Sequence, residues 1–364
     1  MPTNGNAARQ PLVIGLALDV SGSMKSSITN ERGGELARVE GLQAAMDTLL
    51  EEAALLSDAM PAGDSGVQIS IFVYAFGLRL PNNVEACDLL RLVDGLSGAE
   101  ELASKLAEEY ERRLRTNERQ VAIEVMGSSA MKLLSMSRTE AETAVRTAIK
   151  ARIASEIVSR QLAGAVQRLD EDLTIGVHEL ADKWVGFRGS LSTSNELLGG
   201  GTPMCKCLSL IYERFKREHV RQSQQSRFVL FIVSDGEATD GNPRRYARRI
   251  ARLGVQIVSC FVAASDVTGS KQLNSSRDRH WSRGAAAMFD VASRVSADSP
   301  EIDFLEKRGW RTQTRSRPAS VLTRLAELLS RSERAKLFAQ VNHSEHLKEF
   351  MQVVLAPIRS EQTG

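Results

Sequence analysis

Three oxygen-bearing side chains follow one apolar stretch near the start of the chain. Leu12–Leu18 is an apolar run with the length of a strand that is buried on both faces. It is followed by Asp19, Ser21 and Ser23, one carboxylate and two hydroxyls at alternate positions. Ligands of open α/β sheets bind beyond the carboxyl ends of the strands, and Gly22 permits the turn that lets these side chains converge there. Oxygen donors with few formal charges suit a hard cation such as Mg²⁺.

Two further motifs lie far downstream. Three consecutive glycines, Gly199–Gly201, precede Thr202. A loop of this kind loses much chain entropy on folding, which suggests that the Thr202 hydroxyl must be placed accurately. A second buried-strand pattern begins at Phe228 and leads directly to Asp235.

In this order, the Asp19-x-Ser21-x-Ser23 motif, the Thr202 loop and the strand that ends at Asp235 resemble the metal-ion-dependent adhesion site of von Willebrand factor A (vWA) domains. A five-residue pattern of common residues recurs by chance. Three motifs in order, two of them directly after a buried strand, form a specific signal. The alternative is three unrelated polar turns that cap helices.

The resemblance implies a role for each matching residue. The hydroxyls of Ser21, Ser23 and Thr202 would bind the metal directly, and Asp19 and Asp235 would bind it directly or through water. The implied ion is Mg²⁺, with Mn²⁺ or Ca²⁺ as alternatives. An Asp or Glu of a partner protein would replace one water on the metal, so the implied function is a metal-dependent protein-binding module that scaffolds an assembly.

The loop after the third motif resembles that of bacterial intracellular vWA proteins, which include members encoded with AAA ATPases or in tellurite-resistance and phage-conflict clusters. The expected partner is therefore an AAA ATPase, kinase or protease of the same bacterial stress or phage-defence system. In this loop, Asp240 either stabilises the backbone by accepting hydrogen bonds from N–H groups or, with Glu237, enlarges an acidic rim around the ion.

Alternating strand and helix patterns, together with the resemblance, predict an α/β fold with a doubly wound, mainly parallel central sheet that is flanked by helices, as in vWA and Rossmann-like domains. A helix is expected over Glu35–Ser57 and a strand over Val67–Phe76. The vWA-like domain should span residues 11–358. It should contain a large helical insertion at 96–190 and a smaller insertion at 266–334.

One helix of the predicted insertion carries a continuous apolar stripe. The pattern predicts a helix of about 30 residues, roughly twice the usual length. A capping box of Thr139 and Glu142 is expected at its start. The stripe contains Val145, Ile149, Ile153 and Ile157. It is covered either by the insertion itself or by another chain, including a second copy of this one.

Composition excludes several classes of protein. The 364 residues are 42% hydrophobic and 25% charged with a net charge of +2, as in ordinary globular proteins. No apolar run approaches the roughly 20 residues that span a bilayer, and the N-terminal residues lack the pattern of a secretory signal. We therefore expect a cytoplasmic protein without a membrane partner, with its four cysteines reduced.

Two alternative functions are kept open. Arg244, Arg248 and Arg252 share one face of a predicted helix, which could bind nucleic acid or an acidic protein surface. A metal-dependent hydrolase would need a general base beside the ion. The chain has no Walker loop, no G-x-S-x-G elbow and no zinc signature, and its five histidines are expected to be surface or cap residues, so we do not expect an enzyme.

Overall fold

The computed structural model describes ten segments of the chain. They are residues 10–30, 32–58, 68–79, 84–90, 99–167, 174–193, 201–222, 226–263, 271–313 and 334–363. The predictions for Gly199 and Gly200 lie outside these residues, whereas Gly201 and the five predicted metal ligands lie within them.

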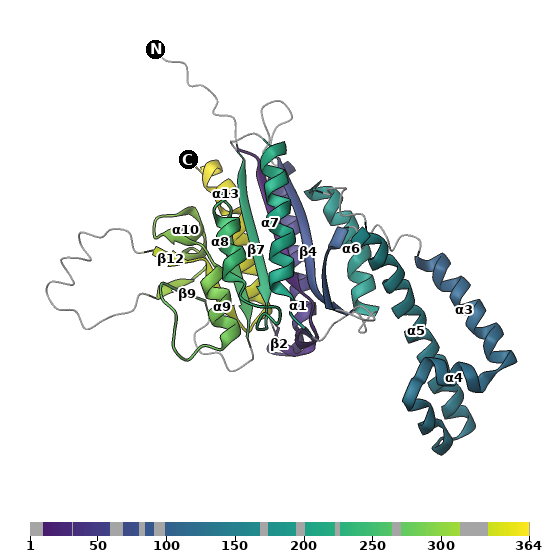
Figure 1. Cartoon of the computed structure of the whole chain (residues 1–364). Coiled ribbons are helices and arrows are strands. Elements are labelled where there is room, and N and C mark those ends of the chain that lie inside the picture. Colours follow the sequence, from purple (N-terminus) through teal and green to yellow (C-terminus); the bar gives the residue numbers. More distant parts are fainter. Residues whose placement is uncertain are drawn as a thin grey trace, which may run out of the picture.

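A seven-stranded, mainly parallel sheet forms the centre of the described fold (Figure 1). In spatial order, six of its strands are β13 (Phe338–Val341), β8 (Gln256–Val262), β7 (Arg227–Ser234), β1 (Leu12–Asp19), β4 (Ile69–Arg79) and β5 (Val84–Asp88). The seventh, β6 (Ile175–Gly176), pairs with β4. The pairs of β4 with β5 and β6 are antiparallel, and the others are parallel. The predicted α/β class with a mainly parallel sheet is confirmed.

Helices cover both faces of this sheet (Figure 1). On one face lie α1 (Arg38–Asp58), α6 (Val177–Thr193) and α12 (Ser344–Met351), and on the other lie α7 (Met204–Arg221), α8 (Arg244–Ala251) and α9 (Arg283–Val291). The side chains of β1 alternate between these two cores: Leu16 and Leu18 pack on the α1 side, and Val13 and Ala17 pack on the α7 side. Burial on both faces is why β1 reads as a continuous apolar run.

A short hairpin separates β1 from α1. Its strands are β2 (Ser27–Thr29) and β3 (Glu35–Ala37), which pair antiparallel. The helix predicted to begin at Glu35 therefore begins at Arg38, because the three residues before it are held in a strand.

The region of the predicted second insertion contains two small two-stranded sheets. β9 (Gln272–Asn274) pairs with β11 (Arg311–Gln313), and β10 (Arg294–Ser296) pairs with β12 (Arg334–Lys336). Two further helices, α10 (Pro300–Glu306) and α13 (Ala356–Thr363), complete this side of the fold.

Three helices form an arm that projects from one side of the sheet (Figure 1). This helical arm consists of α3 (Ala99–Thr116), α4 (Glu118–Met126) and α5 (Arg138–Gln167), with a 3-10 helix at Gly127–Ser135. Its small hydrophobic core is separate from the two cores of the sheet and includes Leu106, Tyr110, Val121, Val145, Ile149, Ile153 and Ile157. The predicted apolar stripe is therefore covered within the chain.

Two details of the predicted insertion differ from the structure. The capping box at the start of α5 is formed by Ser137 and Glu140, not by Thr139 and Glu142: the amide of Ser137 donates to the Glu140 carboxylate at 2.9 Å, and the Glu140 amide donates to the Ser137 hydroxyl at 3.4 Å. α5 therefore begins at Arg138, before the predicted cap residue Thr139. Moreover, Ile175–Trp184 pack in the core of the sheet, so only α3 to α5 stand apart from it.

The four cysteines, all within the described residues, are buried and form no disulfide. Burial raises the pKa of the Cys205 thiol to about 12, which keeps it protonated and unreactive. None of the helices in the described segments is both long and apolar enough to cross a bilayer.

Candidate metal site

The first part of the site lies where β1 ends. Asp19 is fully buried, and its Oδ1 accepts a hydrogen bond from the amide of Ser21 at 2.8 Å. The backbone then continues past Gly77 of β4, which has a φ of +87°. A Cβ at this position would lie 2.6 Å from the Ser21 nitrogen, so only glycine lets β4 approach the loop after β1 so closely.

The end of β7 meets the end of β1 through side-chain hydrogen bonds. Ser234 donates from its hydroxyl to Asp19 Oδ2 at 2.5 Å, and Ser23 donates to Asp235 Oδ1 at 2.6 Å. The hydroxyl oxygens of Ser21 and Ser23 are 3.0 Å apart. Four of the five predicted ligands are thus linked at the carboxyl edge of the sheet, as the parallel pairing of β1 with β7 requires.

Thr202 joins this group through the loop after β7. Its amide donates to the Thr239 hydroxyl and its carbonyl accepts from the Thr239 amide, both at 3.0 Å. At Gly236, directly after Asp235, a Cβ would lie 2.9 Å from the Thr202 hydroxyl oxygen. Glycine at this position therefore leaves the Thr202 hydroxyl room beside Asp235.

Asp240 fixes the loop to the helix that follows Thr202. Its two carboxylate oxygens accept hydrogen bonds from the amides of Cys205 and Lys206, at 3.0 and 2.8 Å. These amides belong to the first turn of α7, where N–H groups have no partner within the helix. The loop-stabilising role predicted for Asp240 is confirmed, although the amides belong to α7 rather than to the loop itself.

The site carries an unusual carboxyl group. Burial raises the pKa of Asp19 to about 7, and the nearby charge of Asp235 adds to this, whereas hydrogen bonds from Ser234 and Ser21 act in the opposite direction. A positive charge beside Asp19 would offset this burial and favour its ionised form.

Arg38 is a site residue that the sequence did not reveal. Its Nη1 lies 2.5 Å from Asp235 Oδ2, and the two side chains are only 11% and 0% exposed. One signal was available: Arg38 occupies the first turn of α1, where the helix dipole disfavours a positive charge. Such a residue needs a negative partner, but sequence alone does not identify Asp235 as that partner.

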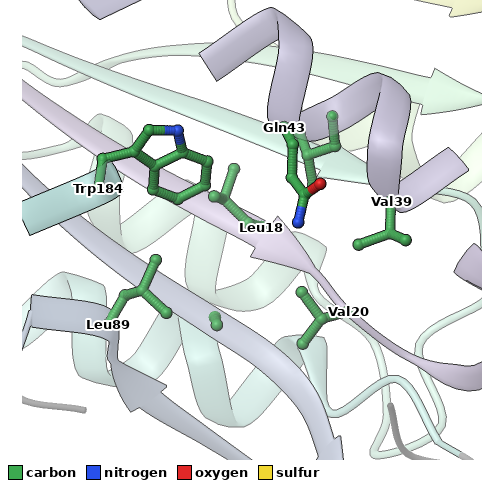
Figure 2. Close-up of a pocket in the computed structure, with 8 residues that line it drawn as sticks. Leu18, Val20, Val39, Gln43, Leu89 and Trp184 are labelled. Atoms are coloured by element: carbon green, nitrogen blue, oxygen red, sulfur yellow. The ribbon is translucent and has the colours of Figure 1, made fainter. Parts of the chain in front are cut away.

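A small, mostly apolar cavity lies near the end of β1. Its volume is about 10 Å³, and Leu18, Val20, Val39, Leu89 and Trp184 line it together with the polar side chain of Gln43 (Figure 2). The space is about the size of one water molecule, and Gln43 is the polar side chain of its lining, so it offers few of the polar partners that a bound water or ion needs.

The assembled donor set is made of oxygen atoms alone. It comprises three hydroxyls, from Ser21, Ser23 and Thr202, and two carboxylates, from Asp19 and Asp235. The segments described by the structure contain no cluster of three or more His, Cys, Asp or Glu residues that could hold a metal, which excludes a zinc-type site there. The chemistry of this donor set fits a hard divalent cation.

Comparison with known proteins gives only distant likenesses. No protein-family model matches the chain, and no curated protein sequence matches it. Among solved structures, the pilus adhesin SpaC of Lactobacillus rhamnosus GG is 9% identical with a TM-score of 0.41, over 95% of this chain and 31% of the adhesin. The conserved hypothetical protein BatB of Bacteroides thetaiotaomicron is 10% identical with a TM-score of 0.40, over 96% of this chain and 99% of BatB.

A third structure, the proximal thread matrix protein 1 of the mussel byssus, is 8% identical with a TM-score of 0.40, over 96% of this chain and 49% of that protein. The chain thus spans less than half the length of two of these three structures. Likeness at this level supports no conclusion about activity, and the functional argument rests on the residues of the site.

Proposed function

We propose that this chain is a metal-dependent protein-binding module of the vWA type. The observation that carries the proposal is the hydrogen-bonded group of Asp19, Ser21, Ser23 and Asp235 at the carboxyl edge of the sheet, with the Thr202 hydroxyl beside Gly236. The proposed ion is Mg²⁺, with Mn²⁺ or Ca²⁺ as alternatives. The proposed ligands are Ser21, Ser23 and Thr202, with Asp19 and Asp235 bound directly or through water.

A bound Mg²⁺ would supply a coordination position for an oxygen atom of a partner. Magnesium takes six oxygen ligands and keeps several of them as water. The chain's residues have distinct tasks: the serine and threonine hydroxyls contribute neutral donors, and the two aspartates contribute negative charge. With at most two carboxylates in the site, the ion retains its attraction for a further carboxylate. The proposed partner is therefore a protein that presents an exposed Asp or Glu, such as an ATPase, kinase or protease of a bacterial stress or defence system.

The first experiment measures metal binding and partner capture together. Calorimetric titration with Mg²⁺ would compare the wild type with the double variant Asp19→Ala/Ser21→Ala, and with Ser26→Ala as a control, because Ser26 is an exposed serine of the same loop. We expect binding in the wild type and control only. A pull-down with and without EDTA follows. Capture that persists in the double variant and in EDTA would remove the metal from the mechanism.

A basic surface favours a second candidate function. Arg244, Arg245 and Arg248 of α8 are exposed, as is Arg252, the residue that directly follows α8. Arg249, beside them, stacks on Tyr212 at 4.1 Å, and Arg244 lies 3.9 Å from Asp290. The exposed arginines could contact an acidic protein surface or a nucleic-acid backbone.

Salt dependence distinguishes these uses of the arginines. Binding to nucleic acid should weaken steeply with salt, because each phosphate contact releases counterions. A double variant, Arg248→Gln/Arg252→Gln, should then reduce retention in a gel shift. Absence of salt-sensitive retention in the wild type would exclude the nucleic-acid function.

A hydrolase remains the lesser alternative. Three of the histidines have contacts elsewhere: His178 lies 3.0 Å from Asp58, His219 contacts the Leu253 carbonyl, and His343 accepts a hydrogen bond from the Glu345 amide at 3.3 Å. Turnover of phosphoesters or peptides in the presence of Mg²⁺ or Mn²⁺, lost in Asp19→Ala, would support it over the binding module.

A further inference from the structure

Arg38 and Asp235 form a nearly buried ion pair inside the proposed metal site. Both oxygens of the Asp235 carboxylate are engaged, since Oδ1 accepts from Ser23 at 2.6 Å and Oδ2 accepts from Arg38 at 2.5 Å. The Asp235 side chain has no exposed surface. A divalent ion and the guanidinium would therefore lie within a few ångströms of each other.

The Arg38 backbone is anchored to the same loop as Ser23. Its backbone amide donates to the Ser26 carbonyl at 2.9 Å, and the Ser26 amide donates to the Ser23 carbonyl at 2.9 Å. The backbone of Arg38 is thus fixed beside the ligand loop, whereas its long side chain can change rotamer. Displacement of the guanidinium requires no movement of α1.

The contact with Asp235 leaves part of the guanidinium without a partner. Arg38 Nε is buried and has no hydrogen-bond partner among the described residues. A buried N–H group without a partner is unfavourable, so this ion pair is not a fully satisfied structural bridge. Loss of the contact would return this donor to water.

We infer that Arg38 is an internal counter-cation that competes with the divalent ion for Asp235 and thereby sets the affinity of the site for metal. The inference rests on the proposed function and concerns the strength of metal binding. With Arg38 in place, one guanidinium and one divalent ion face two carboxylates, an excess of one positive charge. A partner carboxylate would neutralise this excess, so metal and partner should each strengthen the binding of the other.

The test uses the full chain and calorimetric titration with Mg²⁺, with Mn²⁺ binding measured by electron paramagnetic resonance as a second readout. Arg38→Met keeps most of the side-chain length and removes the charge, and Arg38→Lys keeps the charge. Arg32→Met is the control, because Arg32 is an exposed arginine in the β2–β3 hairpin that directly precedes α1. Circular dichroism checks that each variant is folded.

We expect Arg38→Met to bind Mg²⁺ at least tenfold more tightly than the wild type, with Arg38→Lys and Arg32→Met close to the wild type. Acetate, as a probe for the partner carboxylate, should raise Mg²⁺ affinity in the wild type and have less effect in Arg38→Met. Mg²⁺ binding that is detected in Arg38→Met but not in the wild type would also support the inference.

If the wild type binds Mg²⁺ and Arg38→Met binds it equally or more weakly, the inference is overturned. The proposed metal site would then stand, and Arg38 would only position Asp235. Absence of Mg²⁺ and Mn²⁺ binding in all folded variants at millimolar concentration would overturn both the inference and the proposed function.

Discussion

Ser234 donates a hydrogen bond to Asp19 across 215 positions of sequence, with 2.5 Å between Oγ and Oδ2 and no exposed surface on either residue. This bond joins the ends of β7 and β1. It also provides a donor to a carboxylate that burial would otherwise leave poorly solvated.

Ser234→Ala should lower the free energy of unfolding by about 1.5–3 kcal/mol at neutral pH, the range for hydrogen bonds to charged groups. It should also weaken Mg²⁺ binding, because the pKa of Asp19 rises further. Urea unfolding and calorimetry measure the two effects. Ser259→Ala is a matched control: Ser259 is equally buried but donates to the Met288 carbonyl, so its loss should lower stability without altering metal affinity. Equal metal affinity in both variants would contradict the role given to Ser234.

The pKa of Asp19 predicts a specific dependence of stability on pH. Because the pKa is about 7 in the folded chain and 3.8 ordinarily, the folded state holds the proton more strongly, and stability falls as pH rises from about 4 to about 7. The difference corresponds to about 4 kcal/mol. Asp19→Asn should remove this loss. Urea unfolding of both proteins in EDTA at pH 4.5–8 gives the comparison, and parallel curves would contradict the raised pKa.

Metal should reverse this trend. If Mg²⁺ binds beside Asp19, the ionised form is favoured, and stabilisation by Mg²⁺ should increase as pH rises towards and past 7. Urea unfolding over the same pH range in the presence of Mg²⁺ measures this increase. In Asp19→Asn, stabilisation by Mg²⁺ should increase less with pH. An equal increase in both proteins would mean that the ion does not bind beside Asp19.

Gly77 and Gly254 form a natural pair for testing the close approach of β4 to the ligand loop. Both have positive φ, +87° and +80°, but a Cβ at Gly77 would meet the Ser21 backbone at 2.6 Å, whereas no atom lies within 4 Å of one at Gly254. Gly254→Ala should cost about 1–2 kcal/mol from backbone strain alone. Gly77→Ala should cost more and also reduce Mg²⁺ affinity. Equal effects on unfolding and metal binding would show that the Ser21 backbone yields easily.

Substitutions of Asp240 and Glu237 test the two roles considered for the loop after Asp235. Asp240→Ala removes the acceptor of two α7 amides and should lower stability by about 0.5–2 kcal/mol, as for other helix caps. Glu237→Ala should leave thermal stability nearly unchanged, because Glu237 is exposed. A destabilised Glu237 variant would indicate an additional structural contact in this loop.

The sequence was sufficient to locate the strands that carry the site. β1 and β7 are buried on both faces, and burial of this kind produces apolar runs that can be recognised without any structure. Four of the five proposed ligands follow from the same logic, since Asp19 ends β1, Asp235 directly follows β7, and Ser21 and Ser23 come shortly after β1. Their proximity is a property of the parallel pairing of β1 with β7, whereas the identity of a bound ion stays a prediction.

Other features could not be predicted because they depend on tertiary contacts. The position of Gly77 opposite Ser21 requires the register of β4 against β1. The partnership of Arg38 with Asp235 joins residues 197 positions apart. At the start of α5, two overlapping capping motifs are equally good as patterns, and only the folded helix shows that Ser137 is used.

The central place of β1 also bears on how the chain acquires its structure during synthesis. β1 is made before the other strands of the sheet, but one of its two neighbours, β7, emerges from the ribosome only after the helical arm has been made. The arm has a small core of its own with short-range contacts and is therefore free to fold first. Until β7 arrives, one long edge of β1 stays unpaired and prone to aggregation, so slow folding and reliance on chaperones are the expected consequences of this strand order.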